Sequence, residues 1–136
     1  MDNQKKEKRG IKLDKSDYPN LRFDMYSITN DVEYNIITNE WRKLYNRNKE
    51  FMLTFETKEL HDVSWKYVFK LPFFMREIRR LPRLLKHSHI YVYDYRILKM
   101  LKFIFMVQKP LATVYVIFNS RDEMNNKYNK TYIFKP

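Results

Sequence analysis

The chain has 136 residues, 44% of them hydrophobic and 17% aromatic, and its formal net charge is +11. This length suits one domain with a proper core, and the composition excludes a mostly disordered chain. The absence of cysteine excludes disulfides and thiolate metal sites, and the single glycine excludes glycine-rich phosphate loops. We therefore expect an intracellular, cytoplasmic protein without cofactors.

Residues 1–17 are strongly basic, and we predict a disordered arm in which residues 11–13 form at most a short edge pairing. Residues 18–136 are predicted to form a single α/β domain. Apolar and polar residues alternate over 21–26, which predicts a half-exposed strand. A helix is expected to begin at Asn30, because its side chain suits the N-cap position.

The run at residues 51–55 is apolar and aromatic, as in a buried strand, and a second helix is predicted from Ser64. Pro72 is expected to kink that helix. Its predicted buried side consists of Trp65, Val68, Phe69, Phe73, Ile78 and Leu81.

A third strand is predicted at 89–93, a third helix at 95–108 and a fourth strand at 113–118. Residues 120–130 are polar and suit a loop or a short helix, and 131–134 suit an edge strand or a docked tail. The order predicts an α/β fold: a mostly parallel sheet of four to five strands with about three helices and right-handed crossovers.

The high positive charge favours a polyanionic partner: an acidic protein, a nucleic acid or an anionic membrane surface. Helices that run antiparallel to a parallel sheet end at the same side of it. Cations near the ends of the first two predicted helices would therefore gather there, in a surface that we call the basic pole. Its predicted members are Arg42, Lys43, Arg47, Arg76, Arg79, Arg80, Arg83 and Lys86.

Acidic residues are expected at the opposite side, where strands end and helices begin. They complement helix dipoles or, in a second interpretation, bind a divalent cation; no spacing matches a known metal loop. They are Asp31, Glu56, Glu59, Asp62 and Asp94. His61, His87 and His89 could form a zinc site or be unrelated residues. We predict no catalytic residue, because no histidine is paired with a particular serine and acid.

The third predicted helix is apolar on most sides, with a narrow basic stripe. Burial against the sheet, with lysines that extend to solvent, is one interpretation. The other is that a spare apolar flank makes a homodimer or a membrane contact, and its candidates for self-association are Met100, Phe103 and Met106.

Residues 53–65 resemble the core of STAS domains, the fold of bacterial anti-sigma-factor antagonists that Sec14-like modules share in outline. In that family an apolar strand leads into an Asp-Ser-Ser-Gly loop that opens a helix. Asp62 and Ser64 stand where the aspartate and the second serine, which is phosphorylated in bacterial members, would stand. Val63 and Trp65 depart from the motif at the other two positions.

The resemblance implies a non-enzymatic protein-interaction module, and a sequence-independent nucleic-acid-binding protein is the alternative that the charge suggests. The richness in Asn, Lys, Ile, Tyr and Phe is typical of AT-rich genomes, such as those of large DNA viruses and some protists. A viral protein would act in the host cytoplasm or the virion.

Overall fold

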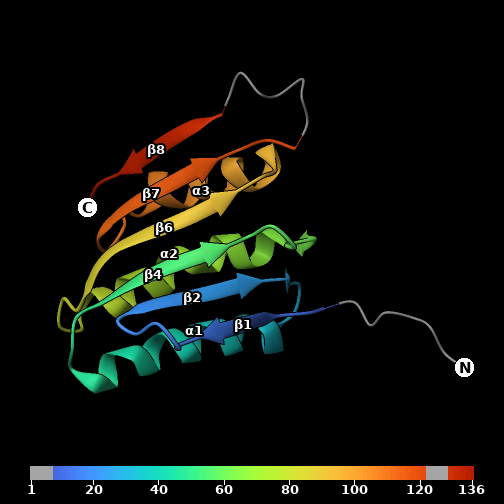
Figure 1. The fold of residues 1–136 in the computed structure, drawn as a ribbon. Coiled ribbons are helices and arrows are strands. Elements are labelled where there is room, and N and C mark those ends of the chain that lie inside the picture. The colour runs from blue at the N-terminus through green and yellow to red at the C-terminus, as the bar shows by residue number, and fades with distance from the viewer. Residues whose placement is uncertain (1–7, 122–128) are drawn as a thin grey trace, which may run out of the picture.

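The computed structural model describes residues 8–121 and 129–136, which form a six-stranded sheet, a two-stranded sheet and three α-helices (Figure 1). The strands are β1 (Ile11–Asp14), β2 (Asn20–Met25), β3 (Ser27–Ile28), β4 (Phe51–Glu56), β5 (Asp62–Val63), β6 (Leu85–Val92), β7 (Thr113–Phe118) and β8 (Lys130–Phe134). The helices are α1 (Asp31–Leu44), the short 3₁₀ helix η1 (Tyr45–Arg47), α2 (Trp65–Arg79) and α3 (Tyr95–Val107).

The large sheet has the order β1-β2-β4-β6-β7-β8. The four central strands are parallel, whereas β1 and β8 pair antiparallel at the two edges. The predicted α/β class, the three helices and the mostly parallel sheet are confirmed. The predicted number of four to five strands was too low.

The extra edge strand β1 lies inside the segment predicted as a disordered arm. Its backbone pairs with β2, with Ile11 opposite Met25 and Leu13 opposite Phe23. Both apolar side chains of β1 therefore lie on the core side of the sheet, and they are only partly exposed. The prediction for residues 1–7 lies outside the described residues.

All three helices cover the same face of the large sheet, and their C-terminal ends lie at the side where the parallel strands begin (Figure 1). The strands alternate accordingly: Phe51, Leu53 and Phe55 of β4 are buried, whereas Met52 and Thr54 between them are partly exposed. The other face, which we call the open face, carries no helix from residues 8–121 or 129–136. Two surfaces could therefore contact a partner: the outer side of the helices and the open face.

Local signals account for the starts of the helices. Asn30 accepts a hydrogen bond from the backbone N–H of Glu33, and Asp94 accepts one from that of Arg96. Ser64 caps α2, where its side chain accepts a hydrogen bond from the backbone N–H of Lys66. Each polar side chain satisfies one of the free N–H groups at its helix terminus.

One side of α2 was predicted wrongly. Trp65, Phe69 and Phe73 are 42%, 52% and 67% exposed, and Leu81 just beyond the helix is exposed as well. Val68 and Ile78 are buried as predicted, and the rest of the buried side consists of Tyr67, Pro72, Phe74 and Met75. Because α2 is apolar on more than one side, the period of its sequence does not show which stripe meets the sheet.

Pro72 lies in the interior of α2, which continues to Arg79. Among the described residues no helix is both long enough and apolar enough to cross a bilayer.

Candidate functional site

The predicted members of the basic pole lie near the C-terminal ends of α1 and α2 or at the start of β6. These ends are at one side of the molecule (Figure 1). Three of the eight are paired with carboxylates: Arg42 with Glu77, Lys43 with Glu40 and Lys86 with Glu50. The fold therefore brings these cations to a common side but neutralises some of them.

Other members bind neutral groups of the protein. Arg79 donates to the backbone carbonyl of Lys109 over 2.9 Å, and Arg76 donates to the side chain of Gln108 over 2.9 Å. Both arginines thus tie the end of α2 to the segment after α3. The guanidinium of Arg47 lies 4.6 Å from the ring centroid of Tyr18. These three cations have a structural role as well as a charge.

Arg80 and Arg83 differ from the rest of the pole. Both are exposed, and neither side chain makes a hydrogen bond or an ion pair within the described parts of the chain. An unpaired guanidinium retains its five N–H donors for a carboxylate or a phosphate. These two residues are the part of the pole that is most available to a partner.

Asp62, the first residue of β5, and Ser64, the N-cap of α2, lie at the opposite side of the molecule. Asp62 is exposed and pairs its backbone with Ser27 of β3. The Ser64 hydroxyl accepts a hydrogen bond from the backbone N–H of Lys66 over 3.3 Å, and its own N–H donates to the carbonyl of Ile28. Ser64 is therefore a helix cap that stays partly exposed.

The self-association residues do not form one surface. Met100 is only 3% exposed and belongs to the core, so its predicted role is wrong. Phe103 is partly buried, and Met106 is 75% exposed. The sequence predicted Met100 on a free flank because α3 is apolar on most sides. In the structure, the side of α3 that carries Met100 is buried.

Aromatic rings gather instead along the seam between α2 and α3. The ring of Phe103 lies 5.2 Å from that of Phe69 and 5.9 Å from that of Trp65, centroid to centroid. Phe73 follows Phe69 by one helical turn, and Met106 follows Phe103 similarly. We call the five residues the aromatic patch. Phe103 and Met106 were predicted to lie on a free flank, whereas Trp65, Phe69 and Phe73 were expected to be buried, so the sequence did not predict the patch as a whole.

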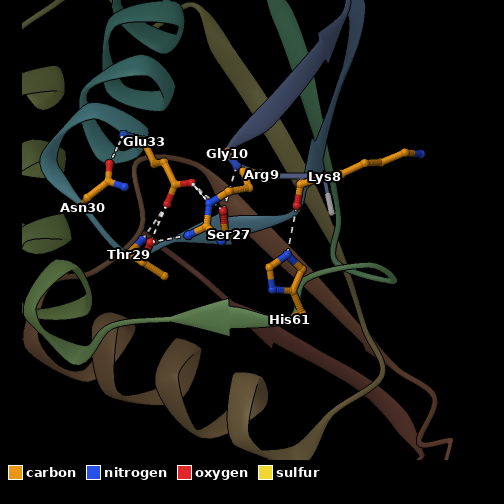
Figure 2. Close-up of polar contacts among 8 residues, drawn as sticks. All are labelled: Lys8, Arg9, Gly10, Ser27, Thr29, Asn30, Glu33 and His61. Atoms are coloured by element: carbon orange, nitrogen blue, oxygen red, sulfur yellow. Dashed lines mark hydrogen bonds and ion pairs between the residues drawn. The ribbon is translucent and has the colours of Figure 1, made fainter. Parts of the chain in front are cut away.

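A buried carboxylate near the N-terminal segment forms the densest polar cluster (Figure 2). Glu33 is 6% exposed and accepts hydrogen bonds from the hydroxyls of Ser27 and Thr29 over 2.7 and 2.8 Å. The Thr29 N–H and the Arg9 guanidinium also donate to it, over 2.9 and 3.1 Å. Burial alone would raise the pKa of Glu33, but these donors outweigh it and lower the pKa to about 2.

The cluster also attaches the start of the described chain. The N–H of Gly10 donates to the Ser27 hydroxyl over 2.8 Å, and the His61 Nε2 lies 2.9 Å from the carbonyl oxygen of Lys8 (Figure 2). The donors to the Glu33 carboxylate thus come from Arg9 just before β1, from Ser27 in β3 and from Thr29 just after β3, so the carboxylate joins these two segments. A carboxylate kept ionised by four donors is a structural anchor and a poor proton acceptor.

The open face carries aromatic and acidic side chains. His89 stacks on Tyr115 at 5.1 Å between ring centroids, with His87 at 5.1 Å from His89. Burial lowers the pKa of His89, and the charge of His87 lowers it further. The Tyr93 hydroxyl donates to Glu56 over 2.8 Å; burial, followed by this bond, raises the pKa of Tyr93 to about 12.

Neither the predicted carboxylate site nor the predicted histidine site is formed by the described residues. His61 binds the backbone of Lys8, whereas His87 and His89 contact each other edge to face in β6. Asp31 accepts from the Tyr67 hydroxyl, which is the main reason that its pKa is lowered. Across residues 8–121 and 129–136, no three His, Asp or Glu side chains come together in a way that could hold a metal ion.

An apolar cavity of about 150 Å³ lies between the large sheet and the helices. Its lining includes Trp41, Phe55, Ile90 and Leu101, and nearly all of it is apolar. The hydroxyl-bearing residues of its lining are Tyr34, Thr57 and Ser88, and the lining includes no Asp, Glu, His or Lys that could activate them. The binding surfaces on the outside of the molecule are therefore the better candidates for function.

Comparison with known proteins does not identify relatives. No protein-family model matches the sequence, and no curated protein or solved structure matches it.

Proposed function

We propose that this protein is a non-catalytic, STAS-like interaction module whose basic pole binds an acidic protein partner. The observation that carries the proposal is the exposure of Arg80 and Arg83 without acidic partners in the described chain, at the side where three helices end. Helix-dipole complementation accounts for cations in the last turns but does not require these two beyond α2. Because the chain lacks cysteine, we expect it to act in a reducing intracellular compartment.

A nucleic acid is the alternative partner, since phosphates would also be attracted by the pole. The open face offers rings for base stacking, such as Tyr91 and Tyr115. However, its cation Arg22 is paired with Asp24 and Asp14, and Glu56 lies on the same face. A stacking surface on which Lys12 lies at the edge and Arg22 is held by two carboxylates suits a phosphate backbone poorly, which favours the protein partner.

In the STAS-like interpretation, Ser64 is also a candidate phosphoacceptor. A phosphate there would meet the free N–H groups at the start of α2, with Lys66 two residues away. Ser64 lies at the side opposite to the pole, so phosphorylation would regulate binding through α2 rather than by blocking Arg80 and Arg83 directly.

Fluorescence anisotropy with a labelled peptide rich in Asp and Glu, and separately with single-stranded and duplex DNA, tests the proposal. The variant Arg80→Glu/Arg83→Glu should weaken peptide binding at least tenfold. The matched control Lys12→Glu/Lys58→Glu changes the net charge equally at exposed positions outside the pole and should weaken it less than twofold.

Equal losses in the two variants would show that only net charge matters and would contradict the basic pole. Tighter binding to DNA than to the peptide, with a steep decrease in affinity as salt rises, would support the nucleic-acid alternative instead. Far-UV circular dichroism of each variant establishes that the fold is retained.

A further inference from the structure

The aromatic patch is an exposed apolar surface on a rigid support. Phe73 and Met106 are 67% and 75% exposed, and Trp65 and Phe69 are 42% and 52% exposed. The ring contacts of Phe103 with Trp65 and Phe69 join the two helices at this surface. The helices cover only one face of the sheet, and no other described element covers their outer side (Figure 1). Contiguous exposed apolar groups of this kind mark an interaction site.

The charges of α3 beside the patch have one sign, whereas the α2 cations Lys66 and Lys70 each lie 3.7 Å from Asp31 of α1. Helix α3 carries Arg96, Lys99 and Lys102 and no Asp or Glu between Tyr95 and Val107. Helix α2 carries one acid, Glu77, which is bound by Arg42. The remaining charged side chains of α2 are cations, and they are Lys66, Lys70, Arg76 and Arg79. A partner surface that complements this one would therefore be apolar at its centre and anionic at its border.

From this arrangement we propose that the outer side of α2 and α3 binds an anionic membrane surface, with the aromatic patch inserted at the boundary between headgroups and acyl chains. Tryptophan and phenylalanine partition into that boundary, and lysines reach from it to lipid phosphates. Lys99 and Lys102 of α3 are of a residue type that is depleted at protein–protein interfaces but attracts anionic lipids. This inference is independent of the acidic partner proposed for the basic pole.

Flotation with vesicles tests it. The full chain should float with vesicles of phosphatidylcholine containing 30% phosphatidylserine, and at least tenfold less with phosphatidylcholine alone. Trp65 is a built-in probe, because brominated acyl chains quench an inserted indole. Quenching should be lost in Trp65→Phe, which retains the partly buried Trp41 as the other tryptophan.

Two pairs of variants separate the apolar and charged contributions. Phe69→Ser/Phe73→Ser should reduce vesicle binding at least tenfold, whereas Ile133→Ser removes a comparably exposed apolar side chain from β8 and should leave it unchanged. Lys99→Glu/Lys102→Glu should abolish the preference for phosphatidylserine, whereas Lys12→Glu/Lys58→Glu should preserve it. Arg80→Glu/Arg83→Glu should still float, which keeps this test distinct from that of the pole.

Absence of flotation with phosphatidylserine vesicles would overturn the proposal, as would flotation that Phe69→Ser/Phe73→Ser leaves intact. A third contrary result is a dimer in light scattering that Phe69→Ser/Phe73→Ser converts to a monomer while no form binds vesicles. The patch would then be a surface between two copies of the chain.

Discussion

At the scale of single residues, Glu33 shows how a buried charge can stabilise a fold. Its carboxylate receives donors from Ser27, Thr29 and Arg9, and its pKa is lowered to about 2 from an ordinary 4.5. A carboxyl group whose folded pKa is lowered stabilises the protein above the unfolded value. That stabilisation is lost as the pH falls from about 4.5 towards 2.

We therefore expect Glu33→Gln to decrease the free energy of unfolding by about 2 kcal/mol at pH 7, because the amide nitrogen cannot accept the bonds that Ser27 and Arg9 donate. Urea unfolding of both proteins at pH 7, 4 and 3 measures the difference. It should shrink as the pH falls, since the wild-type carboxylate becomes protonated. A difference that does not change with pH would contradict this account.

Gly10 is a second residue whose effect is local. Its φ angle is +70°, a left-handed conformation that side chains with a Cβ rarely adopt, and its N–H bonds to Ser27. A Cβ at this position would come no closer than 3.9 Å to the side chain of Glu33, so space is available and the backbone is the constraint.

Gly10→Ala should accordingly lower the free energy of unfolding by about 1–2 kcal/mol through backbone strain. Chemical denaturation measures this loss. The substitution Lys12→Ala, in β1 but without a positive φ, serves as the control and should cost less than 0.5 kcal/mol. Equal stability of Gly10→Ala and wild type would show that the turn tolerates another conformation.

At the scale of elements, α2 has two apolar sides with different roles. Phe74 is 4% exposed and lies against the core, whereas its neighbour Phe73 is 67% exposed. Burial of an aromatic side chain stabilises a fold, and exposure of one does not. The two neighbours provide a direct comparison of the same chemical change.

Phe74→Ala should decrease the free energy of unfolding by about 3–5 kcal/mol, because it leaves a cavity, whereas Phe73→Ala should change it by less than about 1 kcal/mol. Urea titration followed by circular dichroism distinguishes them. A large loss of stability in Phe73→Ala would mean that the exposed side of α2 is covered by another part of the chain.

At the scale of the whole molecule, the formal charge of +11 acts on stability as well as on partners. Like charges repel one another in the compact state, and salt screens this repulsion. Some of the cations are already in ion pairs, such as Arg42 with Glu77 and Lys86 with Glu50, but these pairs are exposed and contribute little.

The melting temperature should therefore be higher in 0.5 M than in 0.02 M potassium chloride. Arg80→Glu/Arg83→Glu lowers the formal charge from +11 to +7 and should show a smaller increase, because less repulsion remains to be screened. Scanning calorimetry of both proteins checks this. A melting temperature that falls with salt would show that attractive ion pairs outweigh the repulsion.

The sequence by itself determined the types of the main elements. The apolar and aromatic run at residues 51–55 predicted a buried strand, alternation over 21–26 predicted a half-exposed one, and the caps Asn30 and Ser64 were recognisable from their residue types. These signals are local: a strand or a cap depends on residues within a few positions of one another. The convergence of helix ends at one side then followed from the βαβ order.

Only the tertiary structure decided which surfaces are free. It buried Met100, exposed Trp65 and Phe69, and paired β1 with the edge of the sheet. Helices that are apolar on several sides, and short edge strands such as β1, can be placed in more than one way by their own residues. Which side of such a helix is buried, and which edge such a strand joins, depends on contacts between segments distant in the chain, and these cannot be read from a local sequence pattern.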